Sequence, residues 1–273
     1  MIIISSRKNF DDPDNFSHQD EVFNLTLGSG GSVLDKTKMQ SSEVTQAVSN
    51  KSILIVIHGY NNDLCDALRA YSIIEYKVKN LLEGGKYDAV VGYVWPGGDK
   101  KLEYHLARSR SSAAGERFVS WLPTFSGVDS LDIMTHSMGT RVLLRGLSSG
   151  VPSSSASIRN HLATASAVDN ESIEYGERFY EATKRSEATW VFHSKKDSVL
   201  RYAYTVGDCD FALGLTGPED PAKISRHSKN VKVVNCKKYV GSHGSYKNCD
   251  KFYRFTDKII NDRHPSSRQF YTL

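Results

Sequence analysis

The sequence predicts an α/β protein with a mostly parallel central sheet and helices on both faces. Short runs of apolar, β-branched residues recur along the chain, and most are followed by a segment with helical spacing of its apolar side chains. The apolar runs are continuous rather than alternating, which is typical of strands that are buried on both faces. Strands that alternate with helices in this way form right-handed βαβ units and a parallel sheet.

Length and composition fit one soluble domain. The chain has 273 residues, of which 39% are hydrophobic and 24% charged, so it can fill a large core. The net charge of +4 comes without a dense basic block, so we expect no nucleic-acid partner. The apolar run at residues 1–4 is too short for a signal peptide, and no window approaches the roughly 18 apolar residues of a membrane helix. We therefore expect a cytoplasmic protein with no membrane partner.

The first 50 residues are polar and rich in turns, and we assign them to the same domain as the rest. Residues 2–5 and 22–27 have the composition of strands. Residues 28–49 contain Gly, Ser and Thr with little periodicity, which predicts a loop or weak structure. No internal repeat is present.

Residues 51–273 form the expected core, with small cap insertions at 97–117 and 201–227. Both insertions mix charged and aromatic residues without a long apolar stripe, so we expect them to cover a site for a soluble substrate rather than aggregated lipid. Basic side chains near Lys100 and Arg108 are compatible with an acidic substrate or with a solvated helix face. The expected strands are 53–57, 88–95, 130–137, 161–168, 188–193 and 230–235, and the expected helices are 64–81, 103–122, 138–147, 172–184 and 250–260.

Ser137 follows a strand and precedes a helix, and we predict that it is a nucleophile. A serine on a sharp strand-to-helix turn is lifted clear of the backbone, and the helix N-terminus behind it favours developing negative charge. The turn requires small residues two positions before and after the serine. Gly139 meets this requirement, whereas Thr135 stands where glycine is usual. A serine that merely caps the helix is the alternative interpretation.

The oxyanion of an acyl-transfer reaction needs two N–H donors. One is expected to be the amide of Met138, directly after the serine. The other is expected from the loop that follows the strand at 53–57, where His58 and Gly59 precede Tyr60. We choose the amide of Tyr60. A tight glycine turn with a structural histidine would explain the same residues.

The acid and the base are expected after the nucleophile, in the order carboxylate and then histidine. Asp197 lies four residues beyond the strand that ends near His193, and His243 lies in a Gly/Ser loop before the last helix. His243 would take the proton and Asp197 would hold its tautomer. Asp169, directly after an earlier strand, is an alternative acid. Either aspartate could instead be a turn or capping residue.

Several segments together resemble the α/β-hydrolase superfamily, and more narrowly a bacterial family of α/β-hydrolases of unknown function. These segments are ILIVIHGYNN, VVGYVWPGG, LDIMTHSMGTRVLLRGL, HSKKDSVLR, LGLTG and SHGSY, which span residues 51–246. The resemblance implies the α/β-hydrolase fold and a triad of Ser137, Asp197 and His243. The sequence departs from the pattern at Thr135 and in the loosely similar stretch at 165–169.

These residues predict a serine hydrolase that cleaves a small-molecule carboxylic ester or thioester through an acyl-serine intermediate. An acyltransferase would use the same residues, and a binding or effector module that has lost activity would share the fold. The sequence does not specify an oligomeric state.

Motifs for metal or organic cofactors are missing from the sequence. It contains no phosphate-binding glycine loop and no HExxH pattern. The four cysteines form no CxxC pair, and buried free thiols are expected of Cys65, Cys209, Cys236 and Cys249. We therefore expect no metal and no cofactor.

Overall fold

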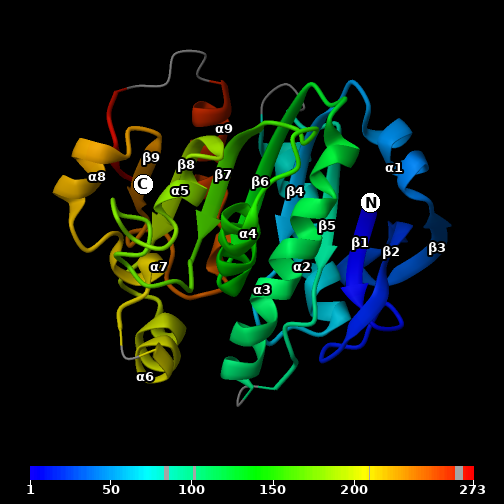
Figure 1. Cartoon of the computed structure of the whole chain (residues 1–273), viewed down its shortest axis with the longest axis horizontal. Coiled ribbons are helices and arrows are strands. Elements are labelled where there is room, and N and C mark those ends of the chain that lie inside the picture. The colour runs from blue at the N-terminus through cyan, green and yellow to red at the C-terminus, as the bar shows by residue number, and fades with distance from the viewer. Residues whose placement is uncertain (83–85, 101–102, 209, 262–266) are drawn as a thin grey trace.

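A computed structural model describes residues 1–82, 86–100, 103–208, 210–261 and 267–273, and it contains a ten-stranded sheet (Figure 1). The strand order is β10-β9-β8-β7-β6-β4-β5-β1-β2-β3. All neighbours from β10 to β1 pair in parallel, and β2 and β3 add an antiparallel end. The strands are β1 Ile2–Arg7, β2 Phe16–Leu27, β3 Val33–Met39, β4 Ser52–Ile57, β5 Ala89–Val94, β6 Ser130–His136, β7 Ile158–Thr164, β8 Ser186–His193, β9 Val231–Asn235 and β10 Phe270–Thr272. This architecture confirms the expected fold class.

Helices cover both faces of the sheet (Figure 1). Helices α3 and α4 pack against each other on one face, and α2 packs with α9 on the other. The close approach of α3 to α4 requires glycine, because a Cβ on Gly115 would lie 2.6 Å from the Gly146 nitrogen. The helices are α1 Ser41–Val48, α2 Leu64–Leu81, α3 Tyr104–Ser120, α4 Met138–Ser149, α5 Tyr180–Thr183, α6 Thr205–Asp208, α7 Leu213–Thr216, α8 Pro221–His227 and α9 Asp250–Asn261.

Four short helical turns connect these elements. They are η1 Ser29–Gly31, η2 Leu122–Phe125, η3 Leu200–Tyr204 and η4 Ser245–Asn248. Among the described residues, no helix is both long and apolar enough to cross a bilayer.

The prediction of a loop or weak structure over 28–49 is wrong, because this segment contains β3 and α1. Strand β3 is exposed along most of its length, so its sequence lacks the apolar alternation that marks a half-buried strand. Pairing with β2 forms it instead. Helix α1 buries only Val44 and Val48, and it begins with a capping box formed by Gln40 and Glu43.

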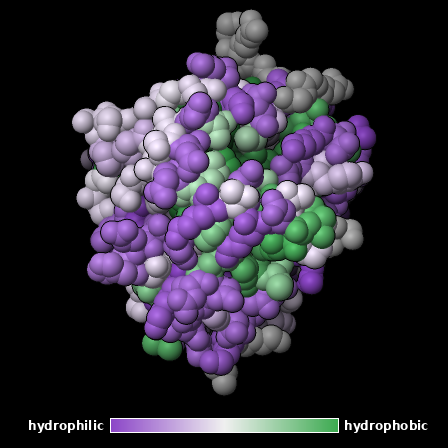
Figure 2. All heavy atoms as spheres, turned by 90° about the vertical axis from the view of Figure 1, so that its right-hand side faces the viewer, coloured by the Kyte–Doolittle hydropathy of each residue, from purple (hydrophilic) through white to green (hydrophobic). Residues whose placement is uncertain are grey.

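The edge of the sheet at β3 lies on the face that Figure 2 shows, which is largely hydrophilic with a smaller hydrophobic area between the charged side chains. Lys36 and Lys38 lie on this strand, and Lys38 pairs with Glu21 of the neighbouring strand. Charged residues on an edge strand discourage pairing with a second chain. The polar sequence of β3 therefore has a structural role.

Two further predictions differ from the structure. The helix expected over 172–184 is reduced to α5, because most of this segment consists of turns and includes Gly176 at a φ of 86°. The segment 97–117, expected to be a cap, contributes most of α3. This helix buries one face against the domain, so it belongs to the core rather than to a cap.

The carboxyl ends of β4, β6, β7 and β8 lie side by side because these strands are parallel neighbours. Ligands of open α/β sheets bind at this edge. The loops that leave these strands contain His58, Ser137, Asp169 and Asp197. The topology therefore gathers the predicted site residues at one edge of the sheet.

Candidate active site

Ser137 stands between β6 and α4 with a strained backbone. Its φ is 54° and its ψ is −125°, a region that residues with a side chain rarely adopt. Such a conformation costs on the order of 1–3 kcal/mol and persists only where the surroundings hold it. Here the Ser137 amide donates to the Thr164 carbonyl at 3.0 Å, and the Ala167 amide donates to the Ser137 carbonyl at 3.1 Å. The loop after β7 thus fixes the turn.

The residues on either side of the turn explain its local sequence. A Cβ on Gly139 would lie 2.5 Å from the Ile57 carbonyl oxygen, so only glycine lets α4 begin this close to β4. Thr135 is buried, and its Oγ1 lies 2.9 Å from both Thr140 Oγ1 and the Nε2 of His161. Because these polar partners accept the larger side chain, the departure from glycine at this position is accommodated.

The loop after β4 passes directly beside Ser137. A Cβ on Gly59 would lie 2.8 Å from the Ser137 Cβ, so glycine is required for this approach. Tyr60 follows in this loop, and its ring contacts Tyr104 edge-to-face at 5.6 Å. The amide of Met138 is the first N–H of α4, one of the donors that a helix leaves without an intrahelical acceptor. Met138 therefore follows Ser137 directly, and Tyr60 follows the glycine that lies against Ser137.

Arg7 of β1 holds this loop in place, and the sequence analysis did not identify it. Its side chain is fully buried, and it donates to the Asn62 carbonyl at 2.7 Å and to the Trp95 carbonyl at 2.9 Å. Burial lowers the pKa of Arg7 to about 10, so the group remains charged at neutral pH. The strand expected at residues 2–5 stops before Arg7, whereas β1 extends to it, so the sequence pattern gave no signal for this residue.

His58 joins the same loop to β5 through both ring nitrogens. The Trp95 amide donates to its Nε2 at 3.1 Å, and its Nδ1 lies 2.6 Å from the Gly59 carbonyl oxygen. The carbonyl can only accept, so Nδ1 carries the proton of a neutral ring. Burial, followed by the charge of Arg7, lowers the pKa of His58 well below its usual value. His58 therefore has a structural role as a neutral hydrogen-bonding group.

Asp197 and His243 are brought together although 46 residues separate them. The Asp197 Oδ2 lies 2.8 Å from the His243 Nδ1, and the Asp197 Oδ1 accepts from the Leu200 amide at 3.0 Å. Asp197 is 1% exposed and the His243 side chain 17% exposed. The pair therefore has a buried carboxylate and a ring that reaches towards the surface, and this arrangement fixes the Nδ1–H tautomer of the ring.

His136, directly before Ser137, anchors the loop that contains His243. Its Nε2–H donates to the His243 carbonyl at 3.0 Å, and the two rings lie 4.7 Å apart. Burial, followed by the charge of His243, lowers the pKa of His136 to about 3. His136 is therefore neutral at pH 7.

In the described structure Ser137 Oγ and the His243 ring are not hydrogen bonded, and such bonds often tighten only when substrate is bound.

Asp169, the alternative acid, has a different partner. Its Oδ1 accepts from the Tyr204 hydroxyl at 2.6 Å, and its backbone forms an isolated bridge with Ala212. Burial and the hydrogen bond to Asp169 raise the pKa of Tyr204. The structure thus pairs Asp197, and not Asp169, with the histidine.

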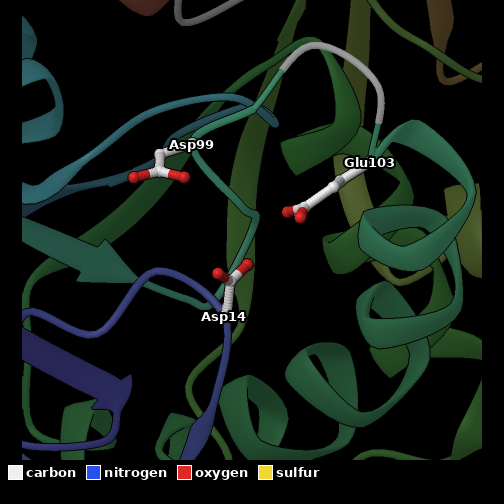
Figure 3. A group of neighbouring side chains, drawn as sticks. All are labelled: Asp14, Asp99 and Glu103. Carbon is white, nitrogen blue, oxygen red and sulfur yellow. The ribbon is translucent and has the colours of Figure 1, made fainter.

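Asp14, Asp99 and Glu103 converge near the same edge of the sheet (Figure 3). Their ligand atoms lie within 4.8 Å of one another. Arg110 pairs with Asp14 at 3.1 Å, and Lys100 lies 3.5 Å from Glu103. These two cations offset part of the negative charge, and the Glu103 Oε2 is buried without a hydrogen-bond partner among the described residues.

Three cysteines are described, and all three are free thiols. Cys236 is buried as expected, whereas Cys249 is half-buried and Cys65, on the first turn of α2, is exposed, so the expected burial is wrong for Cys65. Burial raises the pKa of Cys236 to about 12, so this thiol is not reactive at neutral pH. Cys209 lies outside the described residues.

A buried serine turn at the carboxyl edge of a parallel sheet, with a carboxylate–histidine pair in a neighbouring loop, defines the class of α/β-hydrolase-fold proteins. The chain belongs to the family described as an alpha/beta hydrolase of unknown function (DUF900), whose profile matches residues 35–254. The family assignment confirms the resemblance that the sequence motifs indicated. Arg7 lies outside the matched region.

One similar solved structure is the crystal structure of the product of the gene lin2722 from Listeria innocua. It is 11% identical, has a TM-score of 0.43, and the alignment covers 82% of this chain and 99% of that chain. A comparison with curated proteins finds no match.

Proposed function

We propose that the protein is a serine hydrolase that cleaves a carboxylic ester or thioester through an acyl-serine intermediate. The observation that carries this proposal is the strained backbone of Ser137, which is held by two hydrogen bonds from the loop after β7. A helix-capping serine needs no such conformation. The Asp197–His243 pair supplies the base that a serine nucleophile requires.

In the acylation step, Ser137 Oγ attacks the carbonyl carbon of the ester while its proton passes to Nε2 of His243. Asp197 accepts the Nδ1–H bond and stabilises the imidazolium that forms. The amides of Tyr60 and Met138 donate to the oxyanion. His243 then returns the proton to the leaving oxygen or sulfur, and the bond from the carbonyl carbon to that atom breaks.

Deacylation repeats these steps with water as the nucleophile. His243 takes a proton from water, the oxygen of water attacks the acyl carbon, and Ser137 leaves with the proton. The neutral state of His136 matters here, because a second positive charge 4.7 Å from the His243 ring would oppose imidazolium formation.

We expect small, soluble acyl groups. The segment 201–227 mixes charged and aromatic residues without the long apolar stripe with which a lipase lid contacts lipid. A chain-length series of nitrophenyl esters tests this expectation, and activity that appears only on emulsified long-chain lipid would contradict it.

Ser137→Ala tests the mechanism directly. The variant should lose labelling by a fluorophosphonate probe and lose about 10³-fold or more in kcat on a short nitrophenyl ester. Ser120→Ala, at an exposed position at the end of α3, is the matched control and should keep both. Full labelling of Ser137→Ala would show that another group reacts with the probe.

A further inference from the structure

Arg141, on the first turns of α4, has no partner for its charge. The side chain is 0% exposed, and in the described part of the chain its Nε, Nη1 and Nη2 atoms make no hydrogen bond. A guanidinium carries five N–H donors in a planar fork and is always protonated in proteins. Buried polar groups nearly always have partners, so three unpartnered nitrogens on one side chain need an explanation.

Three further arginines lie in the same neighbourhood. They come from different elements: Arg108 from α3, Arg145 from α4, and Arg178 from the segment before α5. Burial and the charges of Arg178, Arg141 and Arg108 lower the pKa of Arg145 to about 10. Burial and the charges of Arg141 and Arg108 also lower the pKa of Arg178. We call these four residues the arginine group.

The exposure of the arginine group is graded. Arg178 is exposed, Arg108 and Arg145 are half-buried, and Arg141 is buried. The Arg145 Nε is also without a hydrogen-bond partner. The group therefore has a rim that solvent reaches and a base from which solvent is excluded.

The negative charge of Asp169 raises the pKa of both Arg145 and Arg178, against the effect of the neighbouring arginines. Its Oδ1 is occupied by the Tyr204 hydroxyl, and no ion pair is formed between Asp169 and an arginine among the described residues. Among the described residues, Arg141 has no carboxylate partner. Replacing a buried charge with an apolar residue of similar volume is often neutral or stabilising. Arg141 thus gives the fold no evident stability.

The arginine group lies close to Ser137. Arg141 follows Ser137 by four residues, which is about 6 Å along the axis of α4, and side chains of a helix lean towards its N-terminus. Three tyrosine rings also lead from the loop at Ser137 towards Asp169. Tyr60, in the loop beside Ser137, contacts Tyr104, and the Tyr104 ring lies 6.3 Å from the Tyr204 ring. Tyr204 then bonds Asp169.

We propose that the arginine group binds an oxyanion of the substrate, a carboxylate or a phosphate, one helical turn from Ser137. The substrate is then an ester or thioester that carries a negative charge on its acyl or leaving group. This inference rests on the proposed function. The planar fork of Arg141 suits two oxygens of one anionic group.

The kinetic test compares two nitrophenyl esters with acyl chains of the same length, the hemiglutarate and the valerate. Wild type should prefer the charged hemiglutarate in kcat/KM by about ten- to a hundredfold, the range for hydrogen bonds to a charged group. Arg141→Met should reduce this ratio at least about tenfold. Arg254→Met removes the same charge from an exposed position on α9 and should keep the ratio.

The binding test does not depend on catalysis. Glutarate and inorganic phosphate are added separately to Ser137→Ala at constant ionic strength, and Tm is measured. A saturable rise in Tm that disappears in the double variant Ser137→Ala with Arg141→Met supports the site. The anion with the larger effect identifies carboxylate or phosphate. Should Arg141→Met fail to fold, Arg178→Met at the exposed rim replaces it and should weaken both readouts.

Equal kcat/KM for the two esters in wild type, or an unchanged ratio in Arg141→Met, would overturn the proposed substrate class. Absence of a saturable effect of either anion on Tm would overturn the site itself, even if neutral esters are hydrolysed. Arg141-dependent anion binding by a protein that hydrolyses no ester would instead support the site and contradict the proposed hydrolase activity.

Discussion

Arg7 and Arg141 are both fully buried, yet their surroundings differ. Arg7 donates through two of its nitrogens to the carbonyls of Asn62 and Trp95, and it ties together the loops after β4 and β5. Among the described residues, all three nitrogens of the Arg141 guanidinium are without a hydrogen-bond partner, whereas in Arg7 only Nη1 is, and Arg141 lies among other arginines. The Arg7 guanidinium binds backbone carbonyls, whereas the Arg141 guanidinium is the one that we propose binds a ligand.

This difference shows that the partners of a buried charge indicate its role better than its burial does. Leaving a buried polar group unsatisfied costs about 1–3 kcal/mol, and more for a charged group. A protein retains such a cost where function requires it. The two aspartates differ in the same way. The partner of Asp197 is the ring of His243, whereas the partner of Asp169 is the hydroxyl of Tyr204.

The two aspartates provide the largest expected effect. Asp197→Asn should lower kcat on a short ester by about 10³–10⁴-fold, because the amide no longer holds the Nδ1–H tautomer of His243. Asp169→Asn should lower it far less, since Asp169 bonds Tyr204 and not the histidine. Steady-state kinetics on both variants measure this. A larger loss of kcat for Asp169→Asn would show that Asp169, and not Asp197, acts as the acid of the triad.

Replacing Arg7 or Arg141 by methionine measures how each arginine contributes to the free energy of unfolding. Arg7→Met should reduce the free energy of unfolding by about 3–5 kcal/mol, because two buried carbonyls lose charged donors. Arg141→Met should leave this free energy unchanged or raise it by about 1–3 kcal/mol, because an unpaired buried charge is removed.

Urea unfolding at pH 7 measures both variants, with constant m-values as the check that the same surface is exposed. Equal destabilisation of the two variants would show that Arg141 has structural partners comparable to those of Arg7.

A smaller effect concerns the buried histidines. His58 has partners for both ring nitrogens, as a structural group should, whereas the His161 Nδ1 has none in the described structure. Burial lowers the pKa of His161 to about 3, against about 6.5 in the unfolded chain. The folded state therefore binds fewer protons below pH 6.5. The stability from neutral His161 is complete above that pH and is lost as the pH falls towards 3.

His161→Leu should accordingly lessen the loss of unfolding free energy between pH 7 and pH 5 by about 2 kcal/mol. His105→Leu, at an exposed position on α3, is the matched control. Urea unfolding at the two pH values measures the difference for each variant. An unchanged pH dependence in His161→Leu would mean that His161 is protonated in the folded state.

Much of the fold could be predicted because its signals are local. The continuous apolar runs of β4, β6 and β8 identify strands buried on both faces, and the spacing in α2 identifies an amphipathic helix. Strand β3 could not be predicted in this way, since its pairing partner, and not its own pattern, forms it. The segment before α5 has helical composition but lies in turns around Gly176.

The sequence by itself determined the position of Ser137 on a strand-to-helix turn, because the strand, the turn and the helix are contiguous. It determined the order of the candidate acid and base for the same reason. The tertiary structure alone decided which aspartate meets His243, because that contact joins residues 46 apart. It also decided that Arg7 has carbonyl partners, whereas Arg141 has none within the described part of the chain. Both arginines look alike in the sequence, and hydrogen-bond satisfaction in the interior depends on groups that only the folded chain brings near.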